Sequence, residues 1–454
     1  MKSISILTIL VFLLFSCGKK ESETLSLTGL EKRVDSLVQT YLDSAKIAGI
    51  AVAVFRDDEK LLLKSYGYAD LEFDVKLPVN ASFEIGSITK QFTGAAILQL
   101  AEQGKLSLDD EITKYIDFNT QGKKVTIRHL LSHASGIKGY TELPEFEMIG
   151  IQKFQRDTLL RIVEAKPFDF EPGEMIIYSN TGFFMLGLII EKVSDLTYEE
   201  YIMKNLFEKA GMKNSYYCSE NKIIKDRAHG YDTHGESLVR AAYLDHTWPY
   251  AAGSLCSTVE DLVKWNRAIH QGKIFSDRIY QEFISPFMLN NGAITQYAKG
   301  ITVTDRNGKR MLEHAGGING FLSENRYFPD DKVSIVVLIN STGPVSPSDI
   351  ADYITDILFE APPEEFSRFD GDLSKFTGTY KGSGRGRELT VVVTRNDSTI
   401  MIKSGRNDTI SLNYLEDYQW TNGYSIYQFT GIDDSITELR IDNIYGYNIL
   451  RKEK

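Results

Sequence analysis

The chain has 454 residues, of which 42% are hydrophobic and 25% are charged, so it can bury a large core and is not intrinsically disordered. Its 51 Lys and Arg residues against 62 Asp and Glu residues give a net charge of −11, with no run of five basic residues. The sequence therefore lacks the basic surface that a phosphate backbone requires, and we expect no nucleic acid among its partners.

The amino-terminal end carries an apolar run over residues 4–15. A membrane-spanning helix needs about 20 such residues, so this shorter run predicts a secretory signal peptide over residues 1–16. Residues 14–17, Leu-Phe-Ser-Cys, resemble the lipobox of bacterial lipoproteins, in which the cysteine is acylated and becomes the first mature residue. We expect a lipid on Cys17 and a flexible tether over residues 17–28. The protein would then be anchored at the bacterial cell envelope, facing the periplasm or the exterior; the alternative is a signal peptide without a lipid.

The folded body begins with a helical pattern and then a strand pattern. Apolar residues recur at helical spacing and predict an amphipathic helix over residues 30–46. Two β-rich runs at 50–55 and 61–66 flank a polar turn and predict an antiparallel hairpin. From about residue 87 to residue 272 the pattern is mostly helical, which indicates a helical subdomain inserted between the strands of one sheet.

Ser87-Ile88-Thr89-Lys90 places a hydroxyl and an amine one helical turn apart. Ser-x-x-Lys patterns also begin at Ser16, Ser135 and Ser219, but only Ser87 opens a long apolar helix, over residues 91–103. A nucleophile at a helix start gains from the helix dipole, and its own N–H can stabilise an oxyanion. We therefore expect Ser87 to be a nucleophile activated by Lys90; the structural alternative is a helix N-cap.

His129 and His133 are four residues apart, which on a helix would place both on one face as possible metal ligands. The pattern lacks the glutamate of His-Glu-x-x-His, so metal catalysis is the weaker hypothesis. We expect neither a metal nor another cofactor.

Tyr178-Ser179-Asn180 is the only Tyr-x-Asn in the chain. A phenol with an ordinary pKa of about 10 needs nearby cations to act as a base at neutral pH, and Lys90 can supply one. Asn180 offers both a donor and an acceptor for a substrate amide. The alternative is a buried tyrosine that is hydrogen-bonded at a helix start.

Cys218 and Cys256 are the cysteines that follow the signal region. They can pair in only one way, but the sequence does not show whether their Cα atoms come within the roughly 7 Å that a bridge needs. We favour two buried free thiols.

Downstream, residues 299–305 and 309–314 flank Asn307-Gly308, a strong hairpin turn, and residues 333–340 read as a buried strand. His314 ends the second run and is followed by Ala315, Gly316 and Gly317. Glycines there let a ligand's backbone approach the strand edge. We expect His314 to be a second polarising group and the Gly317 N–H to be the second oxyanion donor, beside that of Ser87. Because Lys90 disfavours a second positive charge, we expect a neutral imidazole that donates a hydrogen bond to substrate; the alternative is a protonated imidazole that holds Tyr178 as a phenolate.

A helix over residues 347–359 ends before the breaker Ala361-Pro362-Pro363, where we place a domain boundary. Beyond it, short alternating runs separated by Asn, Asp and Gly predict a small all-β module, a barrel or sandwich, over residues 366–454. The preceding domain would span residues 29–360.

The motifs Ser-x-x-Lys at Ser87, Tyr-x-Asn at Tyr178 and His-x-Gly at His314 follow one another in this order along the chain. This order resembles that of the serine β-lactamase and penicillin-binding-protein superfamily, in particular its class C β-lactamase-like branch. The resemblance covers about residues 30–360, and further matches lie at residues 67–70, 83–86, 127–137, 180–182, 186–187 and 257–262. It implies an α/β (α+β) fold, with an antiparallel sheet flanked by helices and a helical insertion. The last module resembles, more weakly, the lipocalin-like β domains often appended to this branch.

The resemblance also implies a serine hydrolase that forms an acyl-enzyme on Ser87, with Lys90 and Tyr178 as its catalytic partners. Asn180, His314, Gly316 and Gly317 would be the substrate-binding and oxyanion residues. The branch includes D-alanyl-D-alanine carboxypeptidases, D-aminopeptidases and some esterases, so we expect a D-amino-acid peptide or a small ester as substrate, and no cofactor.

One departure bears on the substrate. Class C β-lactamases usually carry Lys-Thr-Gly where this chain has His314-Ala315-Gly316, and histidine there is familiar among the peptidases. A β-lactamase with weak turnover is therefore one alternative, and a non-catalytic binding or sensor protein is another. No Arg or Lys cluster lies between His314 and Phe321 to hold a substrate carboxylate.

Overall fold

The structure is a computed structural model that describes residues 27–43, 47–146, 150–153, 155–219, 221–235, 237–363, 366–405, 407–432 and 435–453. The predicted signal peptide and Cys17 lie outside these residues, and the predicted tether overlaps them only at residues 27–28. None of the helices in the described part of the chain has the length and apolar character needed to cross a membrane.

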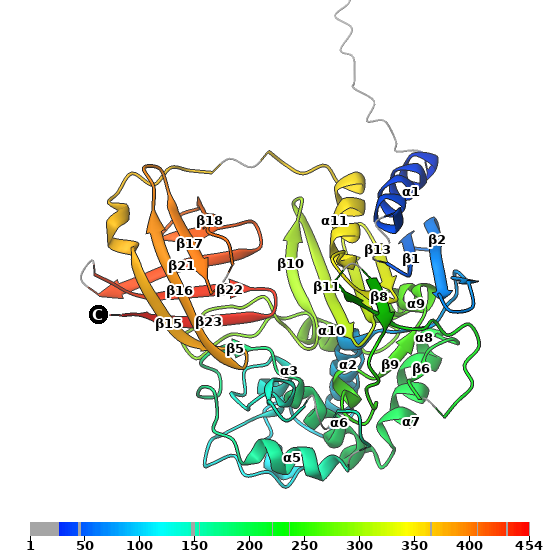
Figure 1. The fold of residues 1–454 in the computed structure, drawn as a ribbon. Coiled ribbons are helices and arrows are strands. Elements are labelled where there is room, and N and C mark those ends of the chain that lie inside the picture. The colour runs from blue at the N-terminus through cyan, green and yellow to red at the C-terminus, as the bar shows by residue number, and fades with distance from the viewer. Residues whose placement is uncertain are drawn as a thin grey trace, which may run out of the picture.

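An antiparallel sheet in the order β10-β11-β12-β13-β1-β2-β3 forms the frame of the body (Figure 1). Its strands are β1 (Gly49–Arg56), β2 (Glu59–Asp70), β3 (Val75–Lys76), β10 (Thr302–Arg306), β11 (Lys309–Ile318), β12 (Phe321–Phe328) and β13 (Val333–Ile339). Every residue of β13 is buried, as its apolar run predicts for a central strand covered on both faces. Both predicted hairpins are therefore present, as β1–β2 and β10–β11.

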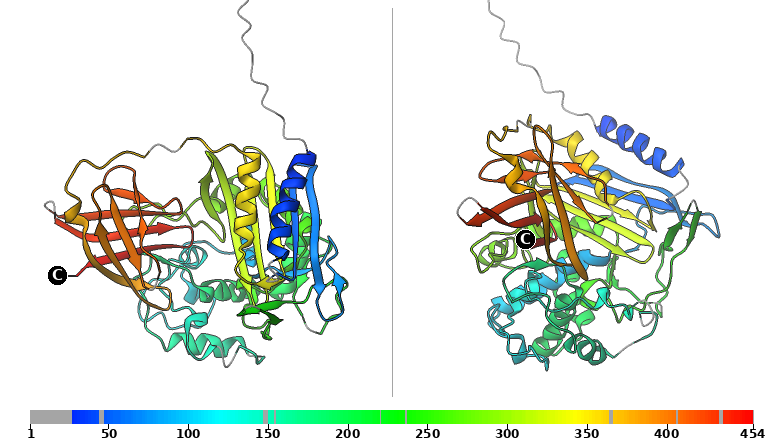
Figure 2. Two further views of the ribbon diagram at one scale, coloured as in Figure 1. Left: turned by 45° about the horizontal axis from the view of Figure 1, so that its top comes forward. Right: turned by 60° about the vertical axis from the view of Figure 1, so that its left-hand side comes forward.

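Helices cover both faces of this sheet. α1 (Leu27–Asp43) and α11 (Pro347–Leu358) lie side by side on one face, as Figure 2 (left) shows. α1 buries Leu30, Val34 and Val38, which are spaced four residues apart and so form one stripe. α2 (Thr89–Glu102) and α9 (Val259–His270) pack on the opposite face.

The helical subdomain lies between β3 and β10 in the chain. It includes α3 (Ile127–Leu131), α5 (Arg156–Glu164), α6 (Asn180–Ser194), α7 (Tyr198–Ile202), α8 (Glu208–Ala210) and α10 (Asp277–Phe283). Short strands form two small sheets beside these helices, in the orders β4-β9-β6 and β14-β7-β8. The strands are β4 (Phe83–Glu84), β6 (Tyr216–Tyr217), β7 (Tyr231–His234), β8 (Ser237–Arg240), β9 (Leu255–Ser257) and β14 (Ser341–Thr342). α6 is apolar on nearly all sides because it runs through the centre of the subdomain.

Cys218 and Cys256 form a disulfide, so the predicted pair of free thiols is wrong. β6 pairs with β9 beside them, with Tyr216 opposite Cys256. This pairing brings the two Cα atoms to 5.3 Å, within the usual range for a bridge. The contact joins residues 38 positions apart, and no local pattern reveals it.

Several predicted strand bounds also differ from the structure; β2, for example, runs from Glu59 to Asp70 rather than over residues 61–66. β10 starts at Thr302 because Lys299 and Gly300 pack against α2, where a side chain on Gly94 would meet the Lys299 carbonyl oxygen at 2.2 Å. β11 continues past His314 to Ile318, because its glycines remain paired with β12.

The C-terminal strands form a nearly closed all-β barrel in the order β18-β17-β16-β15-β23-β22-β21-β20-β19. They are β15 (Gly378–Gly384), β16 (Arg387–Arg395), β17 (Ile400–Ser404), β18 (Ile410–Ser411), β19 (Asn413–Tyr414), β20 (Gln419–Thr421), β21 (Ser425–Ile432), β22 (Ser435–Asn443) and β23 (Gly446–Lys452). The last strand also pairs with β5 (Ile176–Ile177) of the body. The predicted fold class, an α+β body with a helical insertion and a small all-β module, is confirmed.

Candidate active site

Ser87 lies in a one-turn 3-10 helix (Gly86–Ile88) that leads from β4 into α2, and this turn rests directly on β11. A side chain on Gly316 would meet the Ile85 carbonyl oxygen at 2.2 Å, and one on Gly86 would meet the Gly317 nitrogen at 2.9 Å. Glycine at both positions therefore lets the nucleophile reach the strand edge. The missing side chain of Gly316 would point at the protein's own backbone, while Gly316 itself also lines the cavity beside Ser87.

The Lys90 side chain is fully buried and reaches three acceptors. Its Nζ donates to Ser87 Oγ at 3.0 Å, to Asn180 Oδ1 at 2.8 Å and to the Ala252 carbonyl oxygen at 2.8 Å. Burial lowers the pKa of Lys90 well below its usual range, and the positive charge of Arg385 lowers it further. Ser87 caps neither helix with its side chain, so the N-cap alternative does not describe it.

Tyr178 lies between β5 and α6, with its ring centroid 4.8 Å from Lys90 Nζ. Burial raises the pKa of Tyr178 above its ordinary value, while a hydrogen bond with Ser87 and the charge of Arg385 act in the opposite direction. The cation that acts on the phenol is Arg385 rather than the expected Lys90, and burial outweighs its effect. The phenol is therefore protonated at neutral pH, which suits an acid better than a base.

Asn180 is the first residue of α6, and both ends of its amide are engaged. Oδ1 accepts from Lys90, and Nδ2 donates to Thr141 Oγ1 at 3.1 Å. Asn180 thus holds Lys90 in place and at the same time lines the cavity beside Ser87. Thr141 belongs to no motif, so no pattern in the sequence pointed to it.

His314 lies within β11 and is buried. Its Nδ1 is 2.6 Å from the Ala315 carbonyl oxygen, and its Nε2 is 2.9 Å from the Tyr297 hydroxyl. Burial first, and the charge of Lys90 second, lower the pKa of His314 to about 3. The imidazole is therefore neutral, with Nδ1–H donating to the carbonyl and Nε2 accepting from the phenol.

Two backbone N–H groups face the space beside Ser87. Residues two apart on an antiparallel strand direct their N–H groups to the same edge. The Ala315 N–H donates to the Tyr445 hydroxyl at 2.8 Å on the side of β11 away from β12, so the Gly317 N–H points the same way. Together with the N–H of Ser87 it forms a pair of donors suited to an oxyanion.

Two cavities meet at Ser87, Asn180 and Gly317. One, of about 380 Å³, is also lined by Tyr178, His314, Arg385 and Tyr445. The other, of about 160 Å³, is lined mainly by apolar side chains, among them Tyr140, Phe146, Leu244 and Ile318. The predicted site residues of the body thus come together at one place.

Arg385 and Tyr445 belong to the C-terminal barrel, and sequence reasoning missed both. The only signal near Arg385 is the glycine-rich run Gly-Ser-Gly-Arg-Gly-Arg over residues 382–387, which marks a turn but no chemistry. The barrel reaches the site because β23 pairs with β5, immediately before Tyr178.

His129 and His133 do not share a helix face. His129 lies on α3, where its Nδ1 accepts from the Thr126 N–H at 3.3 Å, whereas His133 lies beyond the helix and its Nδ1 accepts from the Ser179 N–H at 3.1 Å. The geometric premise of the metal hypothesis is therefore wrong. The His133 ring instead packs on Tyr178, with centroids 4.2 Å apart.

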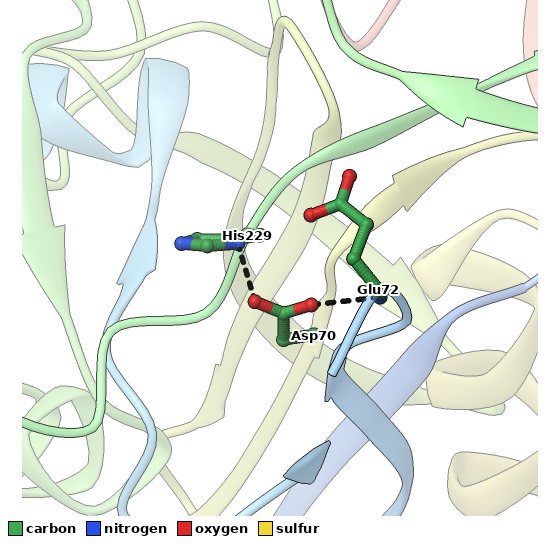
Figure 3. Close-up of side chains that lie close together, drawn as sticks. All are labelled: Asp70, Glu72 and His229. Atoms are coloured by element: carbon green, nitrogen blue, oxygen red, sulfur yellow. Dashed lines mark hydrogen bonds and ion pairs between the residues drawn. The ribbon is translucent and has the colours of Figure 1, made fainter. Parts of the chain in front are cut away.

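Asp70, Glu72 and His229 form a different cluster of potential metal ligands, shown in Figure 3. Asp70 already accepts the N–H groups of Glu72 and Phe73, at 2.8 and 3.0 Å. Arg240 Nη1 lies 2.6 Å from Glu72 Oε2 and 2.8 Å from His229 Nδ1. A guanidinium thus supplies the positive charge at this cluster, which favours a structural role.

A serine at a helix start, a buried lysine one turn away, a phenol and a strand-edge N–H define the class of serine β-lactamases and penicillin-binding proteins. Residues 34–359 match the family described as Beta-lactamase. The chain belongs to this family, which confirms the resemblance seen in the motifs.

Similar proteins agree with this assignment. Penicillin-binding protein 4* of Bacillus subtilis (strain 168) is 30% identical over 68% of this chain and 71% of its own length. The octameric penicillin-binding protein homologue from Pyrococcus abyssi is 27% identical, with a TM-score of 0.65 over 93% of this chain and 100% of its own. A D-amino acid amidase from Ochrobactrum anthropi SV3, solved with L-phenylalanine amide, shares the fold at 21% identity, with a TM-score of 0.64 over 72% of this chain and 98% of its own. The chain spans about 66% of the length of Protein flp of Staphylococcus aureus, another relative.

Proposed function

We propose that the protein is a serine hydrolase that transfers an acyl group from an amide or ester to Ser87 and then to water. The observation that carries the proposal is the contact of 3.0 Å between Lys90 Nζ and Ser87 Oγ, at a lysine whose pKa burial has lowered. A neutral amine at this position keeps its two donor bonds, to Asn180 and Ala252, and accepts the hydroxyl proton of Ser87.

The remaining residues have complementary tasks in the proposed reaction. Ser87 Oγ bonds to the carbonyl carbon, while the N–H groups of Ser87 and Gly317 hold the oxyanion. Tyr178 gives its proton to the leaving group as the scissile bond breaks, and the proton taken by Lys90 then restores the phenol. Water replaces the leaving group in the second half, where the same transfers run in reverse.

The proposed substrates are peptides that contain D-amino acids, or small esters. A D-amino acid amidase with the same fold and the penicillin-binding-protein relatives support this choice. A neutral His314 in place of the lysine of class C β-lactamases favours a peptidase or an esterase. Acylation by a β-lactam followed by slow release is the alternative, and its support is the penicillin-binding relative.

We further propose that the protein is held at the cell envelope by a lipid on Cys17. The disulfide between Cys218 and Cys256 supports export, because disulfides persist mainly in oxidising compartments.

Labelling with a fluorescent fluorophosphonate and a fluorescent penicillin tests the assignment. We expect one label per protein, recovered by mass spectrometry on the peptide that contains Ser87, and no label in Ser87→Ala. Ser219→Ala is the matched control, because it removes the half-buried serine of another Ser-x-x-Lys pattern. Turnover would then be screened with D-amino-acid peptides, muropeptides, p-nitrophenyl esters and a chromogenic cephalosporin.

Undiminished labelling and hydrolysis by Ser87→Ala would refute the proposed nucleophile. A Ser87 label that forms without turnover of any substrate would instead favour the sensor protein.

A further inference from the structure

The tip of the β15–β16 hairpin carries a charged side chain into the cavity beside Ser87. Gly384 pairs with Arg387, so Arg385 and Gly386 form a two-residue turn between the strands. Gly386 has a φ of +68°, and a side chain on it would meet Glu142 Cβ at 2.7 Å. The turn therefore lies directly against the helical subdomain, and Arg385 lines the cavity that Tyr178 and His314 also line.

Hydrogen bonds hold the Arg385 side chain in this position. Its Nε donates to Glu142 Oε1 at 2.6 Å, and Thr141 Oγ1 donates to the same oxygen at 2.8 Å. Because Thr141 also accepts from Asn180, a continuous chain of hydrogen bonds runs from Lys90 to Arg385. Ser383 anchors the hairpin a second time, through a bond from its Oγ to the Asp169 carbonyl oxygen at 3.1 Å.

The far end of the guanidinium is open to a ligand. Among the described residues, Glu142 is the hydrogen-bond acceptor of Arg385 and it engages only Nε, while the arginine side chain remains 50% exposed. The two terminal nitrogens thus have no hydrogen-bond acceptor among the described residues and remain available as a fork. A guanidinium fork of this kind matches the two oxygens of a carboxylate.

Charge is distributed unequally around Ser87. Of the described residues that line the cavity beside Tyr178, Arg385 is the only one with a charged side chain, since His314 is neutral. The second cavity has no charged side chain among its lining residues. One side of the nucleophile therefore suits an uncharged group, and the other suits an anion.

The position of Tyr178 decides which part of a substrate occupies the charged side. In the proposed reaction Tyr178 protonates the leaving group, so the leaving group lies next to its hydroxyl. Arg385 Cζ is 5.2 Å from the Tyr178 ring centroid, and both residues line the same cavity. In an amino acid that leaves through its nitrogen, a single carbon separates that nitrogen from the carboxylate.

We propose that Arg385 binds the free carboxylate of the leaving residue, so that the C-terminal module makes the protein selective for acyl compounds with a carboxylate-bearing leaving group. This inference rests on the proposed function. The bond that breaks joins the acyl carbon to the leaving nitrogen, oxygen or sulfur, which takes its proton from Tyr178. Glu142 is a positioning residue that directs the guanidinium.

The test uses two thioesters that share an N-benzoyl-D-alanyl acyl group and leave as thioglycolate or as its methyl ester. The readout is the ratio of kcat/KM between them, in which any general loss of activity cancels. We expect the wild type to prefer the carboxylate by about tenfold or more, the usual range for a charge-assisted hydrogen-bonded pair. Arg385→Ala should bring the ratio near one, and Arg385→Lys should restore only part of it.

Two further variants separate the guanidinium from its surroundings. Arg387→Ala removes an exposed arginine from the same hairpin and should leave the ratio unchanged. The double variant Arg385→Ala/Glu142→Gln also removes the carboxylate that the single change leaves unpaired, and its ratio should stay near one.

A wild type that turns over both thioesters equally, a preference that survives Arg385→Ala, or a preference restored in the double variant would overturn the role of Arg385. Each of these results leaves the proposed function intact. Failure of both thioesters together with absence of a Ser87 label would refute the proposed function, and this inference with it.

Discussion

The body and the C-terminal barrel contribute to the site in different ways. The body supplies groups that are buried and fully bonded, such as Lys90 with three acceptors and His314 with a partner at each ring nitrogen. The barrel supplies Arg385, which is half exposed and fixed only at Nε. The buried set is organised in advance for chemistry, whereas the exposed arginine can distinguish one substrate from another. On this view the body governs the rate of bond breaking, whereas the barrel governs the choice of substrate.

The largest effect should come from Lys90, on the catalytic side of this contrast. Lys90→Met keeps much of the side-chain volume but removes the proposed base, so acylation should slow on the order of 10³-fold or more. The loss should be equal for the charged and neutral thioesters, measured as the burst rate of thiol release. Lys105→Ala, which removes an exposed lysine just beyond the same helix, should behave as the wild type.

A change in the ratio of kcat/KM between the two thioesters in Lys90→Met would contradict this division between body and barrel, because it would show that the lysine also affects substrate choice. Circular dichroism and the unfolding midpoint show whether the variant is folded.

The next effect concerns stability at low pH. All histidines of the chain lie in the body, so only the body contributes to this effect through histidine protonation. Burial lowers the pKa of His129 to about 4 and those of His270 and His314 to about 3. The unfolded chain protonates these groups near pH 6.5, so it binds more protons than the folded protein below that pH. The free energy of unfolding should therefore fall as the pH falls, by about 2 kcal/mol per histidine at pH 5.

Urea titrations at pH 7 and pH 5 measure this loss. His270→Gln should lose about 2 kcal/mol less than the wild type over the same interval, and the exposed His234→Gln should match the wild type. A stability that rises toward pH 5 would contradict the neutral state of these imidazoles.

The smallest effect should come from Tyr445, a barrel residue that touches the catalytic strand itself. Tyr445→Phe leaves the Ala315 N–H without its acceptor, at a cost of about 1 kcal/mol, and loosens β11 two residues before Gly317. We expect kcat/KM to fall by up to about tenfold for both thioesters, with their ratio unchanged.

Tyr424→Phe is the control on the same module, because Tyr424 is 73% exposed. A shift in the ratio with Tyr445→Phe would place Tyr445 with Arg385 among the residues that choose the substrate.

Much of the body's site could be predicted because its chemistry imposes local spacing. A lysine must follow its serine by one helical turn, and an oxyanion donor must lie on an accessible strand, so the motifs at Ser87 and His314 are visible in the sequence. The fold class follows from the same periodicities. The apolar run of β13 and the Asn307-Gly308 turn each specify one element without reference to distant residues.

The contacts that escaped prediction all join distant segments. Cys218 meets Cys256 only because β6 and β9 pair, and β10 starts late only because Gly94 lets Lys299 approach α2. Arg385 reaches the site through the short pairing of β5 with β23, which leaves no periodic signal. The pKa of Tyr178 depends on its burial, which the sequence around it does not reveal.

The pairing of β5 with β23 also has a consequence for when the site forms during synthesis of the chain. A chain leaves the ribosome from its amino-terminal end, so β5 emerges well before β23. Ile176 and Ile177, which directly precede Tyr178, find their partners Tyr447 and Gly446 only when β23 emerges. Tyr178, the proposed proton donor, therefore gains this neighbouring strand pairing only after β23 has been synthesised. Until then the site lacks the support that the barrel gives it.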